Sequence, residues 1–126
     1  MDAAATGIMK IKIVEARLTH DTEFIGKMDP FVVLNYREQQ YKTKALQGAG
    51  KTPAWKDEEW TVEVKYIGDD VKFTVFDEDV TTNDTVGSGT VKMSAFAING
   101  GIDEWYDIQY KGKAAGKVHM VSKWHP

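Results

Sequence analysis

The sequence of 126 residues contains no cysteine, only three prolines and no long apolar run. The absence of cysteine excludes a disulfide framework, thiolate metal sites and thiol catalysis, and it is compatible with a reducing compartment. No apolar stretch approaches the ~18 residues that a membrane span requires. The first residues also lack the basic and apolar regions of a secretory signal. We therefore expect a soluble, cytoplasmic protein.

The chain also lacks a strong charge of either sign. Sixteen basic residues against nineteen acidic residues give a net charge of −3. Non-specific nucleic-acid binding requires a marked positive excess, so we expect no nucleic-acid partner. Any contact with an anionic partner must come from a local patch or a bound cation. Length and a 42% share of hydrophobic residues predict one domain over residues 1–126, with its core at about 8–124, and we expect a monomer.

Helical periodicity is nearly absent, and alternation of apolar and polar residues dominates the chain. In the clearest case one face would hold Trp60, Val62, Val64 and Tyr66. Similar patterns predict strands at 9–13, 31–34, 41–46, 60–66, 71–76, 86–93, 105–108 and 117–124. Glycine-containing turns separate them, and one helical turn is expected at 94–98. Many short strands without intervening helices predict an all-β sandwich or barrel.

An acidic segment follows the expected strand at 71–76. Its carboxylates are Asp77, Glu78, Asp79 and Asp84. Like charges ~4 Å apart repel by about 1 kcal/mol even in water, so this density of carboxylates needs an offsetting charge. A hard cation with six to eight oxygen ligands would supply it, and Ca²⁺ suits flexible carboxylate loops better than Mg²⁺. The alternative is that these residues serve only turns and local capping.

A second acidic loop lies between the first two expected strands and contains Asp21, Glu23 and Asp29. If both loops leave the same end of a sandwich, they form a two-sided cage of oxygen atoms. Phe24 and Ile25 lie in the middle of this polar loop. They either dip into a membrane interface or fold back against the edge of the core.

Three motifs, in order along the chain, resemble those of the C2 domain family. Residues 26–32 (GKMDPFV) resemble the signature G-K-[SM]-D-P-[YF]-V, and residues 52–58 (TPAWKDE) resemble N-P-x-W-N-E. Residues 75–87 resemble the loop V-x-D-x-D…D-x-x-[IV]-G. The resemblance extends from Ile8 to about Trp124, and within the family the chain resembles the small single-domain C2 proteins of plants.

The resemblance implies an eight-stranded antiparallel β-sandwich whose loops at one end bind Ca²⁺ and then anionic phospholipid. Because the first expected strand leads directly into the first acidic loop, the topology resembles the family's circularly permuted type II form. The family's five metal-binding carboxylates correspond to Glu23, Asp29, Asp77, Asp79 and Asp84. The first of these positions is usually Asp, so Asp21 is a substitute ligand two residues earlier. The third loop is one residue shorter than the common form, which alters the reach of its last carboxylate.

Two functions follow from the resemblance. The first is a Ca²⁺-dependent peripheral membrane-binding module that is recruited from the cytoplasm by its acidic loops, with Phe24 and Ile25 entering the lipid. The second is a Ca²⁺-independent adaptor that binds a protein partner or phosphoinositide through the strand holding Lys42 and Lys44. We do not expect an enzyme, because the chain has no cysteine and no serine in a recognisable arrangement of nucleophile and base.

Overall fold

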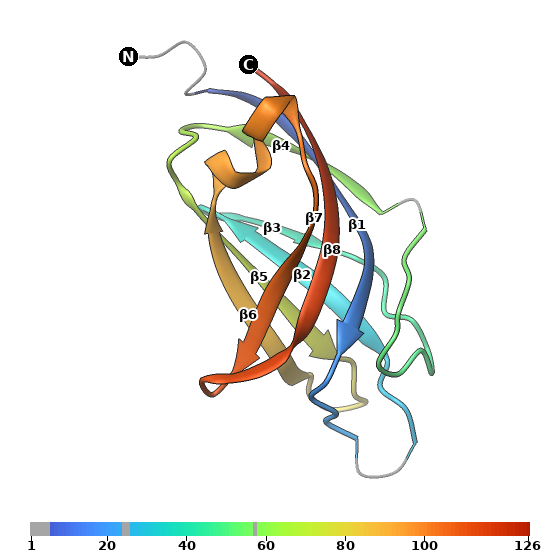
Figure 1. Ribbon diagram of the computed structural model, residues 1–126. Coiled ribbons are helices and arrows are strands. Elements are labelled where there is room, and N and C mark those ends of the chain that lie inside the picture. The colour runs from blue at the N-terminus through green and yellow to red at the C-terminus, as the bar shows by residue number, and fades with distance from the viewer. Residues whose placement is uncertain (1–5, 24–25, 57) are drawn as a thin grey trace.

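The structure is a computed structural model that describes residues 6–23, 26–56 and 58–126. In these residues it has eight strands and two 3₁₀ helices (Figure 1). The strands are β1 (Gly7–Leu18), β2 (Pro30–Tyr36), β3 (Gln39–Lys42), β4 (Glu59–Val64), β5 (Asp70–Asp77), β6 (Asp84–Lys92), β7 (Asp103–Tyr110) and β8 (Lys113–His125). The 3₁₀ helices are η2 (Met93–Phe96) and η3 (Ile98–Gly100), close to the expected helical turn. No helix in the described part of the chain is long and apolar enough to cross a membrane.

Neighbouring strands pair antiparallel, in the order β3-β2-β5-β6-β7-β8-β1-β4. The junction of β6 and β7 consists of one register pair, Ser88 and Gln109, and it separates the two layers of the sandwich. The expected eight-stranded antiparallel fold is thereby confirmed. β1 leads directly into the first acidic loop, as the type II form requires.

The core lies between the layers and is built from the inward-facing residues of the alternating strands. Met9, Ile11 and Ile13 of β1 are fully buried, and so is Val62 of β4. β1 and β4 therefore each contribute one apolar face, as the sequence period of two predicts, whereas β2 is buried on both faces. Burial of this surface stabilises the fold by about 25 cal/mol per Å².

The strand expected at 60–66 is shorter than the sequence pattern suggests. β4 ends at Val64, and Tyr66 is 51% exposed instead of facing the core. The backbone N–H groups of Lys65 and Tyr66 donate to the hydroxyl of buried Tyr36, at 2.9 and 3.3 Å. The prediction for Tyr66 was wrong because a side-chain hydroxyl ends the strand there.

The strand expected at 41–46 also ends early, at Lys42. The backbone N–H of Val32 donates to the hydroxyl of Thr43 at 2.9 Å, where a regular ladder would use a carbonyl. Thr43 is 6% exposed, so its hydroxyl occupies the space between the two chains. The side chain thus takes one bond of the ladder, while the backbone N–H groups of Thr43 and Leu46 still donate to the carbonyls of Val32 and Pro30, at 2.9 and 3.0 Å.

One end of the sandwich carries the β1–β2, β3–β4 and β5–β6 connections, at the bottom of Figure 1. The β7–β8 hairpin turns at the same end, whereas η2, η3 and the C-terminus lie at the opposite end. The two acidic loops of the sequence are therefore brought to one end of the molecule.

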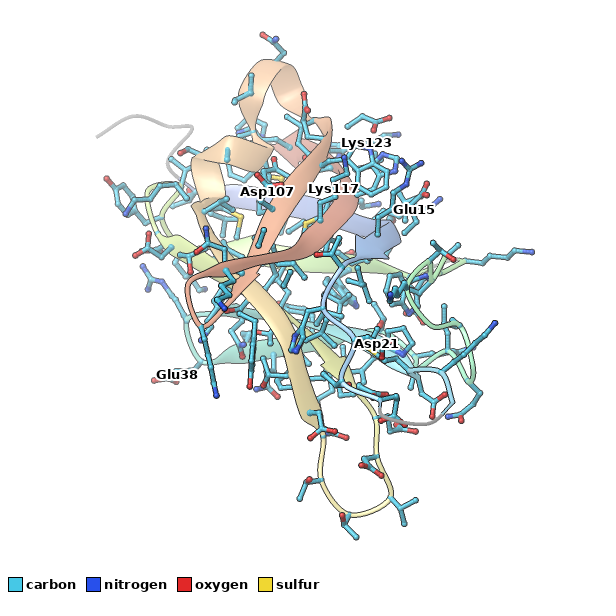
Figure 2. All side chains as sticks on the ribbon, turned by 60° about the horizontal axis from the view of Figure 1, so that its bottom comes forward. Glu15, Asp21, Glu38, Asp107, Lys117 and Lys123 are labelled. Atoms are coloured by element: carbon cyan, nitrogen blue, oxygen red, sulfur yellow. The ribbon has the colours of Figure 1, made fainter. Side chains whose placement is uncertain are left out.

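A charged cluster on the outer face joins β1, β7 and β8. When protonated, His119 donates from Nε2 to Asp103 at 2.5 Å and from Nδ1 to Glu15 at 3.4 Å. Its ring stacks on Trp105 with 4.9 Å between centroids. Glu15 and Lys117 mark this face in Figure 2. Burial lowers the pKa of His119, but the hydrogen bonds and charges of Asp103 and Glu15 outweigh it, so the pKa lies above its ordinary value of 6.5.

We expect protonated His119 to stabilise the fold in a pH-dependent way. The folded chain holds this proton more tightly than the unfolded chain, so the contribution is complete below pH 6.5 and is lost as the pH rises through the raised pKa. Melting temperatures of the wild type and of His119→Gln should therefore converge as the pH rises. The effect should be modest, because solvent reaches Asp103. A temperature difference that stays constant with pH would contradict this account.

Candidate functional site

Strand pairing brings the two acidic loops together. β5 ends at Asp77 and β6 begins at Asp84, and these two residues are register partners. On its other side Asp77 is the register partner of Pro30, the first residue of β2. The β1–β2 connection, which holds Glu23 and Asp29, therefore lies beside the β5–β6 connection. Figure 2 looks toward this end of the molecule.

Three carboxylates from the two loops converge. Glu23, Asp79 and Asp84 each offer an oxygen atom, and these atoms lie within 4.8 Å of one another. Oxygen atoms that share a Ca²⁺ at 2.3–2.6 Å lie within about 5 Å of each other, so the spacing is compatible with one ion. No ion pair found among the described residues involves any of the three. Their mutual repulsion is therefore not offset by a side-chain cation of the described chain.

The neighbouring carboxylates change the pKa of Glu23. A hydrogen bond to Asp77 and the charge of that carboxylate raise the pKa of Glu23 above its ordinary value of 4.5. Burial raises this pKa further, and so do the charges of Asp79 and Asp84. Glu23 thus holds its proton more tightly than an isolated glutamate, as expected for a carboxylate among like charges.

Asp77 lies buried at the bottom of the site, with 1% of its surface exposed. It extends the inward-facing stripe of β5, which also contains Val71, Phe73 and Val75. One carboxylate oxygen accepts the backbone N–H of Asp29 at 2.8 Å, and the other accepts the hydroxyl of Thr22 at 2.7 Å. A buried carboxylate needs such donors, and these two tie the β1–β2 connection to the end of β5.

Asp29 lies at the margin of the cluster and joins a third connection to it. Its carboxylate accepts the backbone N–H of Gly48 at 2.6 Å, and its carbonyl accepts the N–H of Glu78 at 3.0 Å. Gly48 has φ of +69°, a conformation that glycine adopts without strain. Asp29 also lines an open hollow of about 440 Å³, together with Glu78 and Asp79. The structure therefore places Asp29 beside the three converging carboxylates rather than among them.

Asp21 has a local contact. Its carboxylate accepts the backbone N–H of Glu23 at 3.0 Å, two residues along the chain. This is the geometry of an Asx turn, which fixes the direction in which the chain enters the loop. Asp21 is exposed, and its hydrogen bond positions Glu23. Glu23 itself takes part in the cluster.

The residues expected to contact lipid have different outcomes. Phe24 and Ile25 lie outside the described residues. Lys42 and Lys44 are both exposed, at the end of β3 and just beyond it. Lys72 lies on the same outer face as Lys42, because their register partners on β2 are two residues apart.

Sequence analysis missed two contributors to the site, Thr22 and Gly48. Neither carries a charge, and each acts through a hydrogen bond to a carboxylate. Thr22 stands between two acidic residues, which is a detectable signal for a polar loop. Nothing in the local sequence around Gly48 indicates that its N–H meets Asp29, because that contact depends on the tertiary fold.

Comparisons with known proteins agree with this geometry. A family model described as C2 domain matches residues 7–108. The 16 kDa phloem protein 2 of Arabidopsis thaliana is 32% identical over 113 residues, which cover 85% of this chain and 76% of that protein.

Two solved structures share the fold. A C2 domain-containing protein has a TM-score of 0.77 and 28% identity, over 97% of this chain and 90% of the other. The paired C2 domains of Extended-Synaptotagmin 2, calcium bound, have a TM-score of 0.80 and 23% identity, over 95% of this chain and 46% of the other. The sequence match covers most of the chain and the fold agrees with it. The chain belongs to the C2 domain family.

Proposed function

We propose that this C2 domain is a Ca²⁺-dependent peripheral membrane-binding module that docks on anionic phospholipid through its acidic loops. The observation that carries the proposal is the convergence of Glu23, Asp79 and Asp84 within 4.8 Å. Three carboxylates without an offsetting ion pair among the described residues favour a bound cation. The calcium-bound state of Extended-Synaptotagmin 2 is support from a protein of the same fold.

The proposed ligands are Glu23, Asp79, Asp84, Asp77, Asp29 and Asp21. The first three supply the converging oxygens, and Asp77 lies beneath them. Asp29 and Asp21 extend the acidic surface at its margin. Hard carboxylate oxygens on loops suit Ca²⁺, which accepts six to eight ligands, better than Mg²⁺, which requires near-octahedral geometry.

The mechanism is electrostatic. Without metal, the carboxylates of the two loops repel an anionic membrane surface. Bound Ca²⁺ supplies the positive charge that turns the same end toward anionic lipid. Phe24 and Ile25 then add apolar burial at the interface. In this proposal the protein is a monomer without enzymatic activity, and it moves between the cytoplasm and the membrane.

A second candidate function uses the outer face of β3. Lys42, Lys44 and Lys72 are exposed, and none of them forms an ion pair among the described residues. This face favours an anionic headgroup or an acidic protein segment without Ca²⁺. The two functions differ in their response to chelator.

Vesicle binding separates the two candidates. We expect the wild type to sediment with vesicles containing phosphatidylserine in Ca²⁺ and to remain in the supernatant in chelator. The double variant Lys42→Ala/Lys44→Ala should keep the Ca²⁺-dependent part. Its matched control is Lys10→Ala/Lys123→Ala, because these two lysines face each other on the outer side of β1 and β8.

The same assay tests the apolar tip. Phe24→Ala/Ile25→Ala should weaken vesicle binding and leave Ca²⁺ affinity in solution nearly unchanged, because apolar insertion needs lipid.

One outcome would favour the second candidate. If vesicle binding is equal in Ca²⁺ and in chelator and is lost in the Lys42→Ala/Lys44→Ala variant, the β3 face is the membrane-binding site.

Two substitutions should distinguish the structural role of buried Asp77 from the ligand role of exposed Asp79. Asp77→Ala should lower the stability of the metal-free protein by about 1–3 kcal/mol, because the N–H of Asp29 and the hydroxyl of Thr22 lose their acceptors. Asp79→Ala should leave that stability within about 0.5 kcal/mol or raise it, because repulsion falls. Urea unfolding in chelator measures both effects.

Calorimetry should show that Asp79→Ala weakens Ca²⁺ binding even though the metal-free fold is intact. Asp107→Ala is the matched control, since Asp107 is an exposed residue of β7 outside the cluster. Unchanged Ca²⁺ binding by Asp79→Ala would remove this residue from the site.

A further inference from the structure

The sheet leaves two strand edges open, and a hollow lies between them. β3 and β4 end the strand order on opposite sides. A hollow of about 920 Å³ is lined from one side by Tyr36, Glu38 and Tyr41 and from the other by Thr61 and Glu63. This volume is in the range of ligand-binding pockets. The hollow is remote from the acidic loops, because its lining includes the β2–β3 turn at the other end of these strands.

The hydrogen-bond register shows which backbone groups of β4 face the hollow. Ile13 donates its N–H to the carbonyl of Glu58 at 3.1 Å, which makes these residues a hydrogen-bonded pair. In an antiparallel ladder such pairs alternate, so Trp60 and Val62 bond to β1. The N–H and C=O groups of Thr61 therefore point away from β1, toward the hollow.

Contacts just beyond β4 agree with this register. Lys65 has the same parity as Thr61 and Glu63, and its N–H donates to the Tyr36 hydroxyl across the hollow at 2.9 Å. At the other end the N–H of Lys44 donates to the carboxylate of Glu58 at 3.0 Å. Side chains thus bridge the two edges at both ends. Between the bridges the edge of β4 has no backbone partner among the described residues.

This edge lacks two of the usual protections against strand pairing, although it carries the charged residues Glu59 and Glu63. β4 has no proline and no bulge within its six residues. Open edges of this kind are templates for an added strand. The group that fits a row of free N–H and C=O groups is the backbone of an extended peptide.

The surroundings define the side chains of such a peptide. On the inner side lies half-buried Tyr41, with 5.8 Å between the centroids of its ring and the ring of Trp60. This aromatic surface suits apolar residues of the peptide. The cations at the rim are already paired, Arg37 with Asp69 and Lys65 with Glu63, each at 2.7 Å. Glu38 has no ion pair among the described residues and projects from the β2–β3 turn (Figure 2). The remaining charge at the rim is therefore acidic and suits basic residues.

We propose that the free edge of β4, centred on Thr61, binds an extended segment of a partner protein in which apolar residues alternate with lysine or arginine. The segment adds as a strand and bonds to the backbone of Thr61 and Glu63. Its apolar residues lie against Tyr41, and its basic residues lie on the side of Glu38. This interaction needs neither Ca²⁺ nor lipid, so it is independent of the function proposed above.

A synthetic peptide of alternating lysine and valine tests the proposal, with a peptide of alternating glutamate and valine as the charge control. Amide shifts of the full chain are followed in chelator. We expect the lysine peptide to shift the amides of Thr61, Glu63 and Tyr41, and the glutamate peptide to bind more weakly.

Thr61→Pro removes the N–H on the free edge without removing a bond to β1, and proline is tolerated on edge strands. This substitution should weaken binding of the lysine peptide by about tenfold or more, because a carbonyl group of the bound peptide loses its hydrogen-bond donor. Thr61→Val, which keeps the N–H, should bind as the wild type does.

Glu63→Lys provides a second variant in case the proline disturbs the fold. It should weaken binding of the lysine peptide and strengthen binding of the glutamate peptide, because Lys65 loses its partner and a second cation is added at the rim. Glu104→Lys, at an exposed position of β7, should change neither. Equal binding of the lysine peptide by the wild type, Thr61→Pro and Glu63→Lys would overturn the proposal. A concentration-dependent dimer in sedimentation that Thr61→Pro abolishes would also overturn it, because a second copy of this chain would then occupy the edge.

Discussion

The geometry of the acidic end depends on one buried carboxylate. Asp77 ends the inward stripe of β5 with 1% of its surface exposed. Its two oxygens accept the N–H of Asp29 and the hydroxyl of Thr22, which lie on either side of the tip of the first loop. An unpaired carboxylate at this depth would cost several kcal/mol, so the loop must return to it. The positions of Glu23 and Asp29 both follow from this constraint.

The same constraint explains why the acidic end is poised to respond to a cation. Because Asp77 holds the first loop beside the β5–β6 connection, the carboxylates of Glu23, Asp79 and Asp84 are brought together, and the pKa of Glu23 is raised by its neighbours. The fold therefore tolerates a local repulsion that a bound ion would relieve. The free edge of β4 is a different kind of feature, since it offers backbone groups rather than charge. A membrane contact and a peptide contact at these two places would not compete.

Much of the fold could be predicted from the sequence, because alternation reports directly which side of a strand faces the core. The pattern failed at Tyr66, whose N–H donates to the hydroxyl of Tyr36 instead of extending the ladder with β1. The convergence of two loops was also predictable, because the motifs place acidic residues after β1 and β5. The contact of Asp29 with Gly48 was not, since it joins residues 19 positions apart through a loop conformation. Asp21 likewise could not be distinguished from a ligand by residue type, because an Asx turn and a metal site both use its carboxylate.

A Ca²⁺ titration followed by backbone amide shifts tests the central claim most directly. The account predicts that the amides around Glu23 and Asp29 and those around Asp79 and Asp84 shift together, with common midpoints, while Thr61 on the remote edge of β4 does not respond. Mg²⁺ at the same concentration should produce much smaller shifts. An absence of shifts at millimolar Ca²⁺, or a response of one loop without the other, would contradict a shared site between the two loops.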